Sequence, residues 1–266
     1  MHPHAGAQLP VGRAALTLAH PGHELRVFHW IEQARPVVFV LTDGSGSGAE
    51  GRIQSTASLL AEIDGVEAGS VFGRFTDRAI YEAILDHDFG MFIQIADELA
   101  DAFVEARIDY VVSDAEEEYN PSHDVCRMLV ENAVALAQNR RPGLRSYDFM
   151  LVGPPDSCPE ELRAEAIWLS LDAEALQRKL AAAAGYPELQ QEVARAVERY
   201  GIAPFSTECL RPAPAQQHAI RAEHIPYYEQ YGEQRVAEGV YNRVLRYREH
   251  MLPLAEALRG HVAAVC

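Results

Sequence analysis

Short, mostly apolar runs alternate with amphipathic segments along the first half of the chain. Residues 14–19, 36–41 and 108–112 are runs of strand length with few polar side chains, as expected for strands that are buried on both faces of a parallel sheet. Segments with apolar residues at helical spacing lie around and between these runs, at residues 24–33, 52–63, 77–85 and 92–106. The alternation predicts an α/β fold with a mostly parallel sheet and helices on both faces.

The rest of the chain carries more helical pattern. We expect helices at residues 123–138, 173–184 and 188–200, a strand at 149–152 and an edge strand within 205–214. A long amphipathic stretch at 232–258 should be kinked or broken at Pro253, because proline removes a helical hydrogen bond and clashes with the preceding turn. The aromatic segment 227–231 either packs against the sheet as a helix or forms a pocket wall that stacks on a sugar-like ligand.

This pattern is accounted for by one domain over residues 1–266. Residues 1–12 are expected to form a flexible N-terminal extension, and residues 205–260 a C-terminal helical part of the same domain. No apolar run approaches the roughly 20 residues that a membrane span requires, and the N-terminus lacks the features of a secretion signal. We therefore expect a cytoplasmic protein with no membrane partner.

The charge balance changes which partners are expected. The formal net charge is −16, and no basic stripe stands out against it, so nucleic acid is not expected as a partner. The cysteines are far apart and form no CxxC pair, which favours reduced thiols: Cys126, Cys158, Cys209 and Cys266. We expect a small-molecule substrate, and a homo-oligomer is compatible with the sequence.

Metal-binding residue types follow the carboxyl ends of the predicted strands. His20 and His23 flank a Pro-Gly turn directly after the first strand, and His123 follows the strand at 108–112. Loops at the carboxyl ends of parallel strands converge on one crevice, where ligands bind. Three protein ligands and one open position for water are what a catalytic zinc site requires. The sequence therefore predicts a Zn²⁺ site, with Fe²⁺ or another divalent ion as the alternative.

Three motifs resemble those of the LmbE-like/PIG-L family of metal-dependent de-N-acetylases. That family carries AHPDDE after its first strand, a TxG-type turn after its second and HPDH after a later strand. This chain reads AHPGHE at 19–24, TDG at 42–44 and NPSHD at 120–124, in the same order and with fitting spacing. The resemblance covers residues 13–260. It implies a Rossmann-like three-layer α/β/α fold and metal-dependent hydrolysis of an N-acyl amino sugar or sugar conjugate.

Site roles follow from the resemblance position by position. It implies that His20 and His123 are metal ligands and that His23 replaces the family's ligand aspartate. Gly22 stands where the family has its general base, and Asn120 where the family has a histidine that polarises the substrate carbonyl. Asn120 is still able to donate a hydrogen bond to an oxyanion.

The proton acceptor must then come from another residue near the same strand ends. The candidates are the carboxylates that the sequence places there: Glu24, Asp43, Glu118 with its neighbours Glu116 and Glu117, and Asp124. Each has a structural interpretation too: an interaction with a helix dipole for Glu24, a turn residue for Asp43, a solvated loop for the glutamates and a group that orients a ligand imidazole for Asp124. A further possibility is that His23 acts as the base while Asp124 or Asp43 binds the metal.

Substrate-binding candidates lie around these motifs. The resemblance suggests Arg52 and Arg74 as sugar-binding residues, although a surface ion pair is the competing interpretation of both. Tyr119, directly before Asn120, is a third candidate. His218 or His224 would be able to reach the crevice from the far end of the chain.

Two other functional classes compete with hydrolysis. A metal- or carbohydrate-binding family member without hydrolytic activity is favoured by the replacements at positions 22 and 120. A nucleotide-binding protein would use the Gly-Ser loop at 44–48 as a phosphate cradle, but this loop has neither a Lys-Ser/Thr ending nor GxGxxG spacing.

Overall fold

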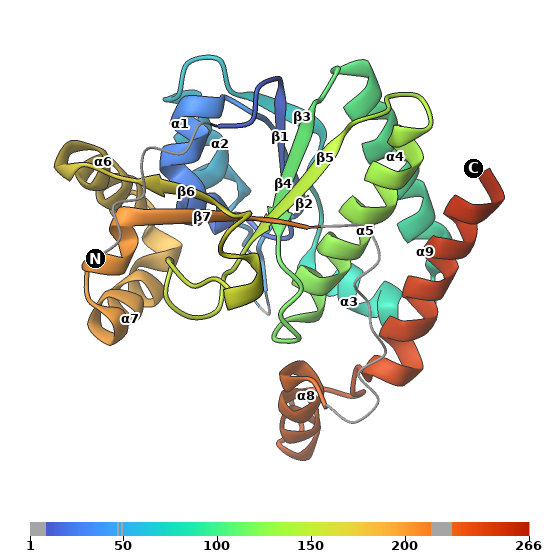
Figure 1. Cartoon of the computed structure of the whole chain (residues 1–266). Helices are drawn as coiled ribbons and strands as arrows, with labels where there is room; N and C mark the ends of the chain where they lie inside the picture. The colour runs from blue at the N-terminus through green and yellow to red at the C-terminus, as the bar shows by residue number, and fades with distance from the viewer. Residues whose placement is uncertain (1–8, 47, 49, 214–224, 266) are drawn as a thin grey trace.

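A seven-stranded, mostly parallel sheet runs through the computed structural model, which describes residues 9–46, 48, 50–213 and 225–265 (Figure 1). Its strands are β1 (Ala14–Leu18), β2 (Val37–Thr42), β3 (Glu67–Phe75), β4 (Tyr110–Asp114), β5 (Arg145–Phe149), β6 (Ile167–Ser170) and β7 (Thr207–Pro212). They are ordered β3-β2-β1-β4-β5-β7-β6. The first five are parallel, and β7 is antiparallel to both of its neighbours.

Helices cover both faces of the sheet, so the fold has three layers (Figure 1). One side carries α1 (Phe28–Ala34), α2 (Ile53–Ala61), α6 (Ala173–Ala184) and α7 (Gln190–Tyr200). The other carries α3 (Asp77–Leu85), α4 (Phe89–Glu105), α5 (Pro121–Gln138) and α9 (Leu252–Val265). Helix α8 (Tyr227–Ala237) projects beyond the layers, on the side of the loop that joins β4 to α5.

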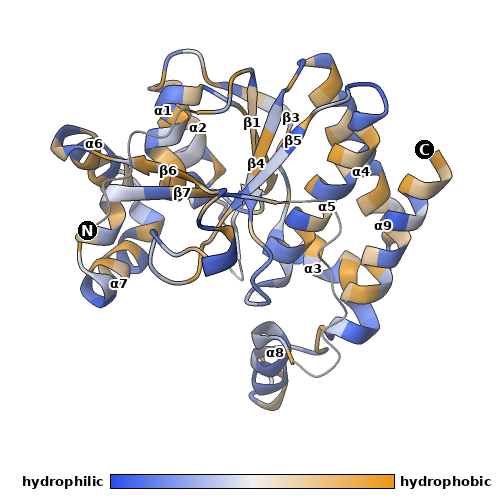
Figure 2. Cartoon of the chain, viewed as in Figure 1, coloured by the Kyte–Doolittle hydropathy of each residue, from blue (hydrophilic) through white to orange (hydrophobic). Residues whose placement is uncertain are grey.

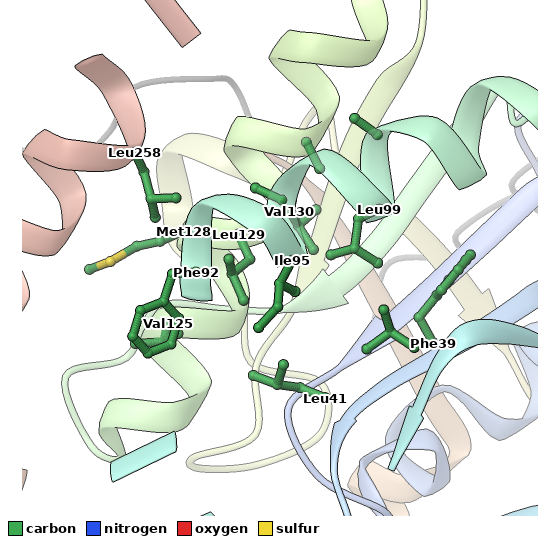
Figure 3. Close-up of a cluster of buried hydrophobic side chains, with 14 of the residues drawn as sticks. Phe39, Leu41, Phe92, Ile95, Leu99, Val125, Met128, Leu129, Val130 and Leu258 are labelled. Atoms are coloured by element: carbon green, nitrogen blue, oxygen red, sulfur yellow. The ribbon is translucent and has the colours of Figure 1, made fainter. Parts of the chain in front are cut away.

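Alternating residues of the central strands supply the two cores. In β2, Phe39 and Leu41 face α4 and α5, whereas Val38 and Val40 belong to the core beneath α1 and α2. This follows from the two-residue period of a strand, which sends successive side chains to opposite faces. Figure 3 shows the first core, where side chains of β2, α4, α5 and α9 meet: Phe39, Leu41, Phe92, Ile95, Leu99, Val125, Met128, Leu129, Val130 and Leu258.

Hydropathy follows the same arrangement. Figure 2 shows hydrophobic residues along β4 and on α4, whereas α8 is mostly hydrophilic on this scale. No helix among the described residues is both long and apolar enough to span a membrane.

The topology brings three loops together at the carboxyl edge of the sheet. Strand β1 pairs with β2 on one side and with β4 on the other, so that Thr17 lies opposite both Phe39 and Ser113. The segments after β1, β2 and β4 therefore leave the sheet side by side. These are the segments that carry the three sequence motifs.

The structure confirms the predicted α/β fold and corrects several of its elements. The strand expected at 149–152 lies earlier, at Arg145–Phe149, and two other strands were not expected. They are β3, which is largely exposed and lacks an apolar run, and β6, which has only four residues. Strand β7 is not an edge strand, because β6 pairs along its outer side. The segment at 24–33 begins as the 3-10 helix η1 (His23–Val27) and continues as α1.

The C-terminal amphipathic stretch is interrupted earlier than Pro253. Helix α8 ends at Ala237, and a π-helical turn, η5 (Tyr247–Met251), leads directly into α9. Pro253 lies inside the continuous helical segment 247–265, directly after the π-helical turn, so the departure from α-helical hydrogen bonding comes just before the proline. Residues 1–8 of the expected N-terminal extension lie outside the described residues.

Candidate functional site

The turn after β1 holds His20 and His23 in a tight, buried loop. Gly22 has φ +99°, a left-handed conformation that favours glycine. The buried carboxylate of Glu24 accepts a hydrogen bond from Gly22 N at 2.8 Å and another from the hydroxyl of Tyr186. Burial raises the pKa of Glu24. These contacts fix the turn and thereby the direction of both imidazoles.

Gly22 has a second reason to be glycine. A Cβ at this position would lie 2.3 Å from Cδ1 of Leu189, in the short helix η3 (Pro187–Leu189) between α6 and α7. Leucine therefore fills the space that a side chain at position 22 would need.

His123 enters the site from the first turn of α5. Asn120 caps this helix, with its Oδ1 accepting a hydrogen bond from Ser122 N at 2.9 Å, and Pro121 follows in the first helical position. Both features favour a helix that begins here. The cap places His123 on the side of the helix facing the loop after β1.

The three imidazoles contact one another. Ring centroids are 5.2 Å apart for His20 and His23, 5.1 Å for His20 and His123, and 4.6 Å for His23 and His123. All three pairs meet edge to face, with interplanar angles between 65° and 88°. Burial lowers the pKa of His23 and of His123 well below the ordinary value, which keeps both rings neutral at neutral pH. The structure thus brings together the three histidines that the sequence singled out.

Two carboxylates hold ring nitrogens of this cluster. His20 Nδ1 lies 2.7 Å from Asp77 Oδ1 and 2.8 Å from Thr42 Oγ1. His23 Nδ1 lies 2.8 Å from Asp114 Oδ2, which also accepts a hydrogen bond from Ala19 N at 2.7 Å. Burial raises the pKa of Asp114 to about 6. For Asp77, burial opposes ionisation, but the hydrogen bond and charge of His20 outweigh it and lower the pKa.

The spacing of the three histidines is that of a metal site, but their nitrogens are not arranged around one point. His20 Nε2 and His123 Nδ1 are buried and have no hydrogen-bond partner among the described residues. Imidazoles sharing one tetrahedral zinc at about 2.0–2.1 Å have ring centroids about 5 Å apart, close to the observed spacings. The described residues nevertheless contain no group of three or more His, Cys, Asp or Glu side chains that would hold a metal ion as they stand.

Three of the carboxylates considered as the base from sequence accept hydrogen bonds from backbone N–H groups. Asp43 Oδ1 accepts a hydrogen bond from Ser45 N, and Asp124 Oδ1 accepts from the backbone N–H groups of Glu117 and Glu118. Glu24 holds the Gly22 turn, as described above. The carboxylates in contact with the histidines are instead Asp77 and Asp114.

The arginine candidates lie in different surroundings. Arg52 donates to Pro21 O and to Gly44 O, both at 2.9 Å, and so ties the loop after β1 to the loop after β2. Its charge helps to lower the pKa of His23, so the guanidinium lies near the cluster. Arg74 instead forms a half-exposed ion pair with Glu98 at 2.7 Å.

Tyr119 is 46% exposed and stacks on Tyr227 of α8. His218 and His224 lie outside the described residues.

Glu117 and Arg26 form hydrogen bonds with the backbone of residues 151–153, the segment that follows β5. The carboxylate of Glu117 accepts hydrogen bonds from Leu151 N at 2.8 Å and Val152 N at 3.0 Å. Arg26 donates to Leu151 O, and to Gly153 O at 3.0 Å. The turn after β1 and the loop after β4 thus both bind the segment that follows β5.

Sequence reasoning did not assign roles to Asp77, Asp114 or Arg26. Asp114 had a usable signal, because it ends the strand at whose carboxyl edge the site lies. Asp77 had none at short range, because its contact with His20 depends on how α3 packs beneath the loop after β2.

Comparison with solved structures shows the same fold in deacetylases. The zinc-inhibited form of teicoplanin deacetylase Orf2 superposes with a TM-score of 0.55 at 14% identity, over 78% of this chain and 100% of that chain. A deacetylase-bog complex from the teicoplanin biosynthesis pathway gives a TM-score of 0.52 at 16% identity, over 78% and 100%. No family model matches the chain, and no curated protein matches it in sequence. At these identities the likeness is one of fold.

Proposed function

We propose that this chain is a metal-dependent hydrolase that removes an acyl group from an amine, and that it is a divergent relative of the LmbE-like/PIG-L de-N-acetylases. The observation that carries the proposal is the cluster of His20, His23 and His123 at the carboxyl edge of the sheet, where two buried ring nitrogens have no partner among the described residues. The deacetylase fold of the structural neighbours supports it.

The three histidines would hold the ion, with zinc as the first candidate and iron(II) or another divalent ion as the alternative. A bound ion of this kind supplies polarisation of the acyl carbonyl and a more acidic water. Asp77 and Asp114 would keep the Nδ1 protons on His20 and His23, which leaves each Nε2 free to bind.

The surrounding residues suit an acylated amine on a sugar-like molecule. Asn120 uses its Oδ1 for the helix cap, so its Nδ2 is the atom that would donate to the acyl oxygen as negative charge develops there. Arg52 lies at the junction of two site loops and would contact the sugar. We propose an N-acetyl amino sugar, or a conjugate of one, as the substrate.

A second candidate is a metal- or carbohydrate-binding protein without hydrolytic activity. It is favoured by Gly22, because Leu189 occupies the space where the family's aspartate base would lie. The side chain of a base cannot be restored at this position without moving Leu189.

Metal content and acetate release test the proposal together. Mass spectrometry on tag-free protein should find about one zinc or iron per chain in the wild type, and far less in His20→Ala, His23→Ala and His123→Ala. His261→Ala, which removes a ring paired with Asp97 on α4, is the matched control and should keep the metal.

Incubation with N-acetylglucosamine oligomers should then release acetate only from the metal-loaded forms. A wild type that binds no added zinc or iron would overturn the proposal. Bound metal without acetate release would favour the second candidate.

A further inference from the structure

A cavity lies between helices α2 and α6, which cover the same side of the sheet (Figure 1). Its volume is about 660 Å³, and ligand sites in proteins commonly measure about 300–1,000 Å³. Its most buried lining residues are Phe28 of α1, Leu59 of α2 and Tyr186, which belong to one hydrophobic cluster. The cavity therefore has an apolar floor that a ligand can cover.

Small residues at the end of α6 leave this space unfilled. Ala181, Ala182 and Gly185 line the cavity from this helix, whereas α2 and the residues that follow it contribute Leu59 and Ile63. Side chains with at most one carbon atom cannot reach across to larger neighbours, so the close packing usual in protein interiors is not achieved here. The gap thus follows from the sequence of α6.

Polar side chains from α2 and its C-cap line the same cavity. Gln54, Ser58 and Glu62 follow one another at intervals of four residues, which places them on one face of a helix. All three residues are exposed, and within the described part of the chain their side chains form no hydrogen bond or ion pair. These groups are therefore available to a ligand.

The charges around the cavity favour a cationic ligand. Arg178 of α6 is the only basic side chain among the described residues that line it. Its guanidinium already donates to both carboxylate oxygens of Glu32, at 2.7 and 3.2 Å, and to Glu174 at 3.3 Å. Glu62 has no counter-charge among the described residues, in a chain whose net charge is −16. A positively charged group is therefore attracted to this cavity, and an anion is repelled.

The cavity is separate from the histidine cluster. None of the three histidines lines it. Tyr186 does line it, and the hydroxyl of Tyr186 donates to Glu24, the carboxylate that holds the turn between His20 and His23. A ligand in the cavity would therefore leave the histidines free.

We propose that this cavity binds a small organic cation, with an ammonium group beside Glu62 and an apolar body between α2 and α6 over Phe28. The inference does not depend on the proposed function, because its test involves neither metal binding nor acetate release.

Titrations with phenethylamine and phenethyl alcohol, followed by the amide shifts of isotope-labelled protein, test the proposal. The two probes share one apolar body, and the amine is protonated at neutral pH as lysine is. The amine should bind about two- to fivefold more tightly than the alcohol, the range expected for an exposed ion pair. The shifts should be confined to α2, α6 and residues 185–187.

Matched variants separate the two parts of the site. Glu62→Gln should lower the affinity for the amine to that for the alcohol, whereas Glu105→Gln, at the end of α4 on the other side of the sheet, should not. Ala181→Leu should weaken the binding of both probes because it fills the cavity. Ala184→Leu changes an exposed residue of α6 outside the cavity and should behave as the wild type.

His123→Ala should bind both probes as the wild type does, and thermal unfolding shows whether each variant is folded. Shifts that centre on residues 20–24 and disappear in His123→Ala would overturn the inference. Equal affinities of the wild type for the amine and the alcohol would also overturn it, as would the absence of saturable shifts.

Discussion

Two of the three clustered histidines have a carboxylate beside Nδ1. Asp77 contacts His20 and Asp114 contacts His23, in both cases at Nδ1. Partners of this kind fix the tautomer and ring orientation of metal-binding histidines, and their loss commonly weakens metal affinity about 10- to 100-fold.

Under the proposed metal role, Asp114→Asn should weaken zinc binding by at least about tenfold, because the neutral amide removes the charge that would hold the His23 proton on Nδ1. Competition with a chromogenic chelator measures the affinity directly, without reference to activity. Asp101→Asn, which affects a surface ion pair with Arg140, is the control and should not change the affinity. Unchanged affinity in Asp114→Asn would contradict the role given to this carboxylate.

Two separate effects favour glycine at position 22: its positive φ and the contact that a Cβ would make with Leu189. Substitutions at other positions can measure each effect alone. Gly143 has a similar φ, +92°, with no atom within 4 Å of an added Cβ, whereas a Cβ at Gly22 would meet Leu189. Gly143→Ala should therefore cost about 1 kcal/mol of stability, from backbone strain alone. Gly22→Ala should cost about 2–4 kcal/mol, because overpacking adds to the strain.

Denaturant unfolding of the double variant Gly22→Ala/Leu189→Ala isolates the packing part. In the Leu189→Ala background, the cost of Gly22→Ala should fall to that of Gly143→Ala. Simple additivity would show that the two side chains do not compete for the same space.

The residues of the histidine cluster could be predicted from the sequence because they are carried by short motifs at strand ends. Their partners could not all be predicted in this way. Asp77 reaches His20 through the packing of α3, and Leu189 reaches Gly22 from a connection that lies more than half a chain away. Contacts of this kind depend on tertiary packing, which leaves no local pattern.

At the scale of the structural elements, Glu117 joins the loop after β4 to the segment after β5, because its carboxylate accepts hydrogen bonds from Leu151 N and Val152 N. Burial raises the pKa of Glu117 to about 7, against the opposing effects of the Leu151 and Val152 amides and of the charges of Arg211 and Arg26. The folded chain therefore retains a proton that the unfolded chain releases near the ordinary value of 4.5. The stability contributed by this proton is fully present below about pH 4.5 and is lost as the pH rises through about 7.

Glu117→Gln should remove this pH dependence. The free energy of unfolding of the wild type, measured relative to the variant, should decline between about pH 4.5 and 7.5. Urea unfolding at a series of pH values gives this difference. Glu161→Gln, in the exposed turn η2 (Glu160–Leu162), is the control and should run parallel to the wild type. A Glu117→Gln curve parallel to that of the wild type would refute the explanation.

The strands were predicted most accurately where both faces are buried, and the helices where a side chain caps the first turn, as Thr76 does for α3 and Asp172 for α6. Strands β1, β2 and β4 are apolar and were located to within a few residues, and α3 and α6 have the expected bounds. Strand β3 was missed because its exposed pattern resembles that of a loop, although it pairs with β2. Helix α8 ends at a local glycine cap that the sequence reading overlooked, because Gly239 has φ +72° and the backbone N–H groups of Gly239 and Val240 donate to Val236 O and Arg235 O.

At the scale of the whole molecule, one buried ion pair joins the C-terminal third to the N-terminal helix. Lys179 of α6 lies 2.8 Å from Glu208 of β7, and their side chains are only 4% and 0% exposed. Glu208 also accepts hydrogen bonds from His29 N and Trp30 N at the start of α1. Three elements that are distant in sequence therefore meet at one carboxylate.

Lys179→Met should destabilise the fold by about 3–5 kcal/mol, because it leaves a buried carboxylate without its counter-charge. The adjacent Arg178 pairs with Glu32 at the surface, where solvent screens the charges, so Arg178→Met should change the stability far less than Lys179→Met. Thermal and denaturant unfolding of the two variants provide the comparison. Similar losses would show that the buried pair has no special role.

The pairing of β1 with β4 also has a consequence for the order in which the protein is made and folded. The bond from Ala19 N to Asp114 spans 95 positions, and the contact of His23 with Asp114 spans 91. A chain emerging from the ribosome holds two of the histidines long before the third exists. Closing so long a loop is entropically costly and typically slow. The histidine cluster is therefore expected to assemble late in folding. A chain that ends before α5 would contain His20 and His23 but not His123.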